Sequence, residues 1–291
     1  ETTGYLCHIF LKEAATEHNL LYHDELNTNI HPEEVFKNGR PFHATIFAKD
    51  QAGLKELFKV VSQSNIEYYY RVPRILRSML SSRRDSFLLG SGCAEGEVFE
   101  AMMQKGYNEA KEKAKFYDYI EIMPKAIYRP LIKKELIRNE HHLEEIIQNL
   151  VRLGDELGKP VVATGNVHYL NPENKIYREI LLTSLNNGVP QEYPDAHLRT
   201  TDEMLKEFAF LGEDKAYEVV VTNSNWVSDQ LEEITPVKDE LYTPKIEGAA
   251  EEITKLSYDK AHEWYGNPLP KIVEDRIKKE LKSIIGNGFS V

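Results

Sequence analysis

The stretch from Val161 to Leu170 combines residue types that could hold a metal ion or a phosphate. It reads VVATGNVHYL, so an apolar run is followed by a glycine-containing turn, then by Asn166 and His168. Because one residue separates them, both side chains point to the same side of an extended backbone. An oxygen ligand beside an imidazole at the carboxyl end of a strand is suited to binding a metal or a phosphate. The alternative is a capped turn with a hydrogen-bonded histidine, and this stretch alone favours that alternative.

Cys93 and His43 are further candidates for such a site. An apolar run over 87–90 ends in Ser91-Gly92-Cys93, which puts Cys93 at the carboxyl end of a predicted strand. A lone cysteine is usually a small buried hydrophobe, but the neighbouring glycines raise the possibility of a ligand. His43 falls at the start of a predicted strand over 42–48, whereas a site residue is expected at the carboxyl end of a strand. This position is the argument against including His43.

The elements that must position these residues alternate between strands and helices. Strands are predicted over 42–48, 87–90, 119–122 and 161–163, and helices over segments between them, such as 143–157. Strand–helix–strand repeats imply right-handed parallel crossovers, so an open α/β sheet and an α/β barrel both remain possible. In either, the carboxyl ends of the strands carry the site. The first residues are predicted as helix, because Leu6, Phe10 and Ala14 fall at four-residue spacing.

An aromatic stretch interrupts this alternation. Tyr68, Tyr69 and Tyr70 lie next to Arg71 and Arg74. Stacked tyrosines beside arginines could contact nucleic acid. Packing at a domain edge is the favoured interpretation.

The amino-acid composition limits the possible protein class and domain organisation. The 291 residues are 41% hydrophobic and 29% charged, as in a globular protein, and no apolar run approaches the length of a membrane span. The net charge of -11 argues against a self-sufficient nucleic-acid-binding segment. Two distant cysteines fit a reducing cytoplasm. We expect a domain boundary near Pro236, and we expect the chain to be a piece of a longer protein.

Several stretches, in the same order, resemble the PolC-type DNA polymerase III alpha subunit, a bacterial replicative polymerase. They include RPFHATIFA at 40–48, GSGCAEGE at 90–97, residues 161–170, 238–244 and 280–289. The resemblance implies three parts. Residues 1–20 would be the last helix of an inserted exonuclease domain, 21–235 the second part of a polymerase-and-histidinol-phosphatase (PHP) domain, and 236–291 the start of the polymerase palm.

The resemblance also implies a site. PHP domains resemble a (β/α)7 barrel with metals at the carboxyl ends of the strands. The residues of this chain that match family ligand positions are His43, Cys93, Asn166 and His168. Related proteins usually have Asp where this chain has Asn166, and a neutral amide is the weaker ligand. The resemblance therefore implies zinc or manganese held weakly here, and magnesium for the parent polymerase. No catalytic residue is assigned to this chain.

Three hypotheses follow from the resemblance. The first is a replicative polymerase segment whose PHP part is mainly a structural platform, in a parent that binds primer-template DNA, deoxynucleotides, the sliding clamp and other replisome subunits, with no membrane partner. The second is a metal-dependent phosphoesterase active in its own right. The third is a docking module for replisome proteins. The family's early H-x-H motif is absent, so this chain alone should be inactive as a phosphoesterase.

Overall fold

The computed structural model of the chain describes residues 7–12, 41–185, 193–237, 240 and 244–291. The chain divides into two compact units, Glu1–Pro236 and Val237–Val291. This division falls at the position where the sequence predicts a boundary. Which domains of a larger protein the two units represent stays a prediction.

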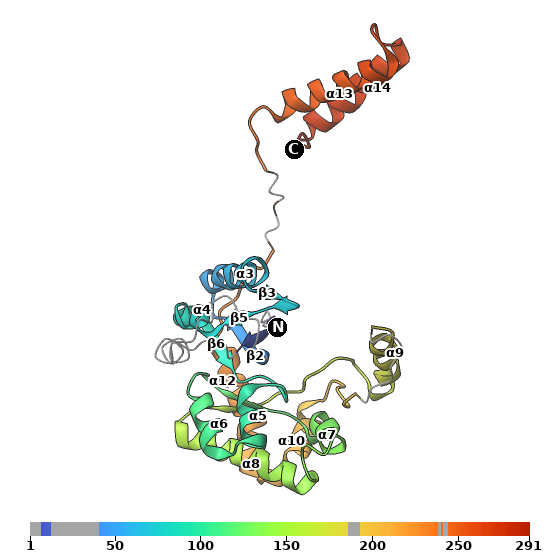
Figure 1. Ribbon diagram of the computed structural model, residues 1–291. Coiled ribbons are helices and arrows are strands. Elements are labelled where there is room, and N and C mark those ends of the chain that lie inside the picture. The colour runs from blue at the N-terminus through green and yellow to red at the C-terminus, as the bar shows by residue number, and fades with distance from the viewer. Residues whose placement is uncertain (1–6, 13–40, 186–192, 238–239, 241–243) are drawn as a thin grey trace, which may run out of the picture. The chain divides into compact units, whose positions relative to one another are not determined.

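The first unit alternates short strands with helices (Figure 1). Its strands are β1 (Cys7–Lys12), β2 (Pro41–Ala48), β3 (Tyr69–Tyr70), β4 (Val72–Pro73), β5 (Ile75–Leu76), β6 (Phe87–Gly90), β7 (Ile120–Ile122) and β8 (Val161–Ala163). Its helices are α3 (Gln51–Ile66), α4 (Arg77–Ser81), α5 (Glu97–Gln104), α6 (Tyr107–Ala114), α7 (Lys125–Lys133), α8 (Glu140–Leu157), α9 (Lys175–Leu185), α10 (Thr201–Glu207), α11 (Glu213–Tyr217) and α12 (Asn223–Asp229). A π-helical segment, Glu218–Thr222, joins α11 to α12.

Capping residues set the ends of several helices. The Asp50 side chain accepts a hydrogen bond of 2.6 Å from the Gly53 amide at the start of α3. Helix α8 begins after Asn139 and ends at Gly158, which is left-handed with a φ of 64°. A capping box formed by Thr200 and Glu203 precedes α10.

The strands form one interrupted array. Strands β5, β1, β2 and β6 are hydrogen-bonded in that order, and β7 pairs with β8. A parallel bridge between Gly90 and Tyr119 connects β6 to β7. Within the described part of the chain the array does not close into a barrel, so the structure shows an α/β fold but not the seven-stranded closure.

The prediction that parallel crossovers join the strands is wrong for β2, which lies between β1 and β6. Strand β2 runs antiparallel to both β1 and β6, with Thr45 opposite Gly90. The prediction of parallel pairing is correct for β7 and β8. Residues 49–86 include α3 and the small strands β3 to β5, so the connection from β2 to β6 is not a single helical crossover.

The prediction of a helix over residues 1–20 is also wrong where the chain is described. Cys7–Lys12 is strand β1, and it pairs antiparallel with Pro41–Ile46 of β2. A short apolar run fits either structure, and pairing with a neighbouring strand satisfies its backbone groups. The other residues of this predicted helix lie outside the described residues.

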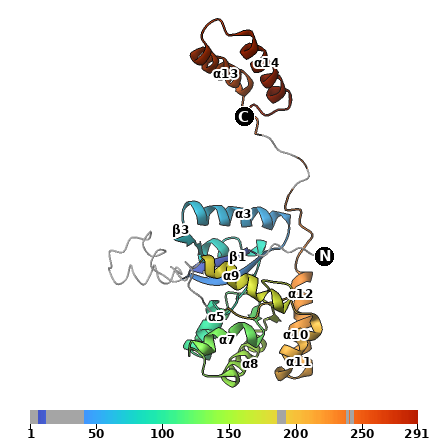
Figure 2. The ribbon, with the colours of Figure 1, turned by 90° about the vertical axis from the view of Figure 1, so that its right-hand side faces the viewer.

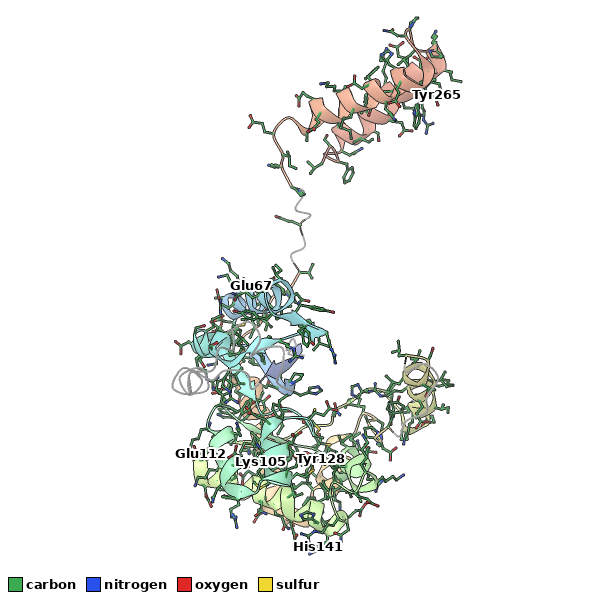
Figure 3. All side chains as sticks on the ribbon, viewed as in Figure 1. Glu67, Lys105, Glu112, Tyr128, His141 and Tyr265 are labelled. Carbon is green, nitrogen blue, oxygen red and sulfur yellow. The ribbon has the colours of Figure 1, made fainter. Side chains whose placement is uncertain are left out.

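Helices cover the array on two sides. Figure 2 shows α3 along one side of the β1–β2 region, while α5, α7 and α8 lie on the other. The core between them contains Ile46, Leu89 and Ile120, which are fully buried. The surface of the helical layer is polar: Figure 3 shows Lys105, Glu112 and His141 at its outside, and the His141 side chain is 80% exposed.

The second unit is a helical hairpin of α13 (Ala249–Tyr265) and α14 (Lys271–Gly286). Among its described residues the buried hydrophobic ones are Ala261 and Leu281, whereas Trp264 and Ile272 are exposed. No helix among the described residues is long and apolar enough to span a membrane.

We expect trypsin to cut the native chain first after Lys245, because this residue is exposed and follows the junction between the two compact units. Mass spectrometry of the earliest fragments should find residues 1–245 and 246–291. Replacing Lys238 and Lys245 by Gln should slow this first cut. A first cleavage within residues 41–236 would contradict the boundary.

Candidate functional site

His43 and Cys93 lie in contact at one end of the sheet. The antiparallel pairing places the start of β2 beside the carboxyl end of β6, which removes the objection to His43. His43 Nδ1 lies 3.1 Å from Cys93 Sγ, and His43 Nε2 lies 3.1 Å from a carboxylate oxygen of Glu95. The His43 amide also donates to the Glu95 carbonyl at 3.1 Å. The start of β2 and the loop that follows β6 therefore hold this pair together.

Gly92 permits this close approach. Its φ is 77°, which L-residues with side chains rarely adopt, and an added Cβ would lie 2.6 Å from the carbonyl oxygen of His43. The glycine that precedes Cys93 is therefore required by the geometry of the pair.

The Cys93 thiol is held in its protonated form. Burial raises its pKa from an ordinary value of 9.0 to about 11, and the charges of Glu95 and Glu121 add to the increase. A protonated thiol can donate to the neighbouring imidazole nitrogen. Since metals bind the thiolate, a metal at Cys93 would have to displace this proton.

Asn166 and His168 line a second part of the site. The turn after β8 carries Asn166 at a φ of 44°, a left-handed conformation that Asn tolerates better than most residues. Both residues line a cavity of about 540 Å³, together with Glu121 and the apolar side chains of Val162 and Met123. The structure thus brings Asn166 and His168 to one cavity, as their spacing predicts.

Glu121, which is not among the site residues predicted from the sequence, connects the two pairs. Its side chain is buried, with the residue 5% exposed. One carboxylate oxygen accepts from the Gly92 amide at 3.3 Å, and the other accepts from the Thr164 hydroxyl at 3.2 Å. Burial raises the pKa of Tyr119, and the charge of Glu121 and a hydrogen bond with the Glu121 side chain raise this pKa further. The signal was present in the sequence: one charged residue between two isoleucines of a buried strand.

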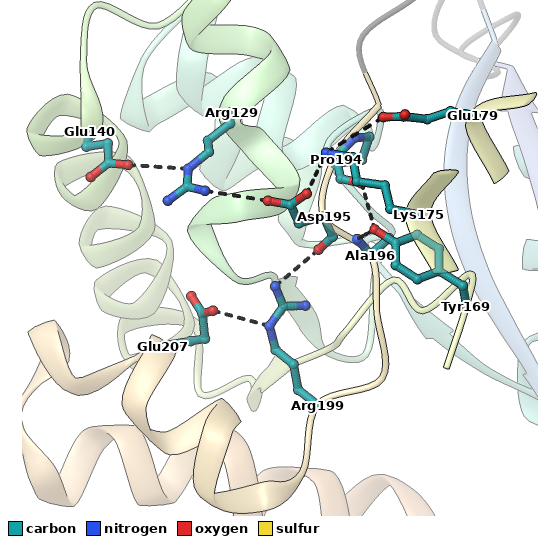
Figure 4. Close-up of polar contacts among 10 residues, drawn as sticks. All are labelled: Arg129, Glu140, Tyr169, Lys175, Glu179, Pro194, Asp195, Ala196, Arg199 and Glu207. Carbon is teal, nitrogen blue, oxygen red and sulfur yellow. Dashed lines mark hydrogen bonds and ion pairs between the residues drawn. The ribbon is translucent and has the colours of Figure 1, made fainter. Parts of the chain in front are cut away.

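A segment near residue 196 fixes the backbone at His168. The His168 amide donates to the Ala196 carbonyl at 2.8 Å, and Leu198 donates to the Tyr169 carbonyl at 3.0 Å. The Tyr169 hydroxyl accepts from the Ala196 amide at 2.8 Å (Figure 4). Residues 194–199, which we name the strap, therefore run beside the His168 segment.

Charged side chains anchor the strap at both ends. Asp195 lies between Lys175 of α9 and Arg129 of α7, and Arg199 pairs with Glu207 of α10 at 3.2 Å (Figure 4). The hydrogen bond from Lys175 holds the pKa of Asp195 below its usual range. Because Asp195 and Lys175 are partly exposed, these pairs orient the strap more than they stabilise the fold.

A complete metal centre is not formed by the described residues. Across the described part of the chain, no three His, Cys, Asp or Glu side chains lie close enough to hold a metal ion. His43 and Cys93 offer two donors with the thiol protonated, and Asn166 and His168 face the cavity beside Glu121. The assignment of His43, Cys93, Asn166 and His168 as metal ligands stays a prediction.

Comparison with known protein families matches part of the chain to a described domain type. A family model described as "PHP domain" matches residues 15–128. The matched range includes His43 and Cys93 as well as residues outside the described part of the chain. Asn166 and His168 lie beyond it.

The chain is similar over its whole length to proteins named "DNA polymerase III PolC-type". The identity is 56% for the protein of Pediococcus pentosaceus, 56% for that of Listeria monocytogenes and 55% for that of Bacillus subtilis. In each case all of this chain is covered and 20% of the relative. The chain thus spans about a fifth of the length of the curated relatives that it matches.

We expect Glu121→Ala to lower the free energy of unfolding by about 1–3 kcal/mol, because the buried Gly92 amide and the partly buried Thr164 hydroxyl lose their acceptor. Glu121→Gln keeps an acceptor oxygen at similar volume and should lose less. Urea unfolding followed by circular dichroism measures both. An alanine variant as stable as the original chain would show that the carboxylate does not hold the strand ends.

We expect Cys93 to react with iodoacetamide only at strongly alkaline pH. In a Cys7→Ser background with a chelator present, the rate should reach half its maximum near pH 11, since the raised pKa keeps the thiol protonated below that. The urea-unfolded chain provides the control, with a midpoint near its ordinary value. A native midpoint at or below pH 9 would contradict the buried, protonated thiol.

Proposed function

Because the chain belongs to the PolC-type DNA polymerase III family and spans about a fifth of its members' length, we propose that it is an internal segment of a replicative DNA-directed DNA polymerase. Residues 21–235 would be the second part of the PHP domain, 236–291 the start of the palm, and 1–20 the end of the inserted proofreading exonuclease. The parent protein would act on primer-template DNA and deoxynucleotides, with magnesium as its cofactor, in the bacterial cytoplasm. Its partners would include the sliding clamp and other replisome subunits.

Within that polymerase, the PHP part acts mainly as a structural platform. The observation that carries this proposal is the arrangement at Glu121: its carboxylate is buried and receives hydrogen bonds from protein groups that include the Gly92 amide and the Thr164 hydroxyl. A carboxylate used in this way ties segments of the fold together. The neutral Asn166 and the protonated Cys93 thiol lower the charge available for a polynuclear metal site.

The barrel of a PHP domain would be completed by residues of the parent protein. In the described array, β5 and β8 lie at the two ends. Unpaired strand edges favour pairing with further strands. We therefore infer that an upstream part of the parent pairs with this array and closes a (β/α)7-type barrel.

A metal-dependent phosphoesterase is the second candidate. The contact between His43 and Cys93 favours it, because an imidazole and a thiol suit zinc, with manganese as the alternative ion. Bound there, a metal would supply Lewis-acid chemistry. A docking module for other replisome proteins is the third candidate.

The platform proposal predicts the behaviour of the parent polymerase. His43→Ala and His168→Ala together should leave its primer-extension rate within about twofold of the original, because neither imidazole would take part in nucleotide addition. Glu121→Ala in the same protein should lower its thermal stability. A loss of extension beyond about tenfold in a folded histidine variant would overturn the platform proposal.

Metal binding gives a separate prediction. We expect elemental analysis of the purified chain to find at most one weakly held zinc per molecule, with no turnover of a generic phosphoester. Asn166→Asp should strengthen metal binding in a complete PHP domain, because it adds a charged oxygen ligand while Asp tolerates the left-handed turn. Robust turnover that His168→Ala abolishes would favour the phosphoesterase.

A further inference from the structure

The hairpin formed by β3 and β4 projects a short aromatic and basic tip. Its register pairs Tyr69 with Pro73 and Tyr70 with Val72, so Arg71 alone makes the turn. Arg71 accordingly adopts a φ of 63°, the left-handed region that arginine rarely occupies. The three residues at the tip are therefore Tyr69, Tyr70 and Arg71.

Two of the three tyrosines are exposed, which differs from the packing role predicted from the sequence. Tyr68 is partly buried against the core, in agreement with a packing role. Tyr69 and Tyr70, in contrast, are 56% and 36% exposed. Two neighbouring tyrosines that remain exposed after folding need another explanation.

A buried arginine supports the tip from beneath. Arg74 is 5% exposed, and its Nε donates to the Tyr70 carbonyl at 3.2 Å. Its guanidinium carbon lies 5.3 Å from the centre of the Tyr70 ring, and that of Arg71 lies 5.6 Å from it. These contacts hold Tyr70 and Arg71 in one arrangement, so the tip is preorganised.

Arginine is concentrated at and just after the tip, although the chain as a whole is acidic. Five arginines fall between residues 71 and 84 in a chain with a net charge of -11. Arg77, Arg83 and Arg84 form ion pairs with Glu97, Glu56 and Asp118, respectively. Arg71 makes no ion pair with another described residue and lies exposed beside the two exposed rings, so it is available to an anionic ligand.

We propose that this tip is a contact site for single-stranded DNA, in which a base stacks on Tyr69 and a phosphate pairs with Arg71. Exposed aromatic rings beside a cation are the features that bind single strands without sequence preference, because each base presents a face for stacking. A duplex hides those faces within its own stack and would use Arg71 alone. The choice of ligand rests on the proposed polymerase function.

Fluorescence anisotropy with a labelled oligothymidine of about ten nucleotides, at about 50 mM salt, tests the site on the whole chain. Tyr69→Ala should weaken binding about tenfold, whereas Tyr69→Phe retains the ring and should bind like the original chain. Arg71→Gly suits the left-handed turn, so it removes the guanidinium without backbone strain, and it should also reduce the salt dependence. Tyr217→Ala, which removes a ring that is 54% exposed elsewhere, is the matched control.

Photo-crosslinking locates the contact directly. An oligonucleotide carrying 5-iododeoxyuridine should crosslink to the peptide that contains Tyr69. The proposal is overturned if the chain does not bind the oligonucleotide, if Tyr69→Ala binds like the original, if binding to duplex is equally strong, or if crosslinks map elsewhere. An absence of binding would favour a protein partner for the tip, and every one of these results would leave the primer-extension test of the proposed function unaffected.

Discussion

A buried carboxylate must find hydrogen-bond donors inside the protein, and this requirement organises the strand ends of the first unit. Glu121 meets it with the Gly92 amide after β6 and the Thr164 hydroxyl after β8, while its own strand is β7. Because an unpaired buried charge costs several kcal/mol, the three segments are held in one arrangement. The candidate residues follow from it: Cys93 comes just after Gly92, and Asn166 lies two residues beyond Thr164.

The sequence predicts the positions of the strands along the chain but not their relative directions in the sheet. Apolar runs marked the segments that became β2, β6 and β8, since burial on both faces produces such runs. Strand direction depends on long-range pairing, and the antiparallel β2 was therefore missed, together with the reason why His43 reaches Cys93. The strap at residues 194–199 was missed for a similar reason, because its partners are distant in sequence. Asn166 and His168 were predictable from local spacing.

The electrostatics of the site agree with a structural role. The raised pKa of Cys93 keeps a proton on the best zinc ligand, and the amide of Asn166 adds no charge. The polar contacts of Glu121 and Tyr169 are instead made with backbone and hydroxyl groups. In a polymerase segment, such a unit would supply rigid surfaces to its neighbours, and the exposed tip at Tyr69 is one surface that could be used.

The central claim is that protein hydrogen bonds at Glu121, and not a bound metal, hold the strand ends together. The most direct measurement is the thermal unfolding midpoint of the purified chain before and after removal of metal by a chelator. The account predicts the same midpoint in both samples. A midpoint that falls on chelation and returns on adding zinc would show that a metal performs the role assigned here to the carboxylate.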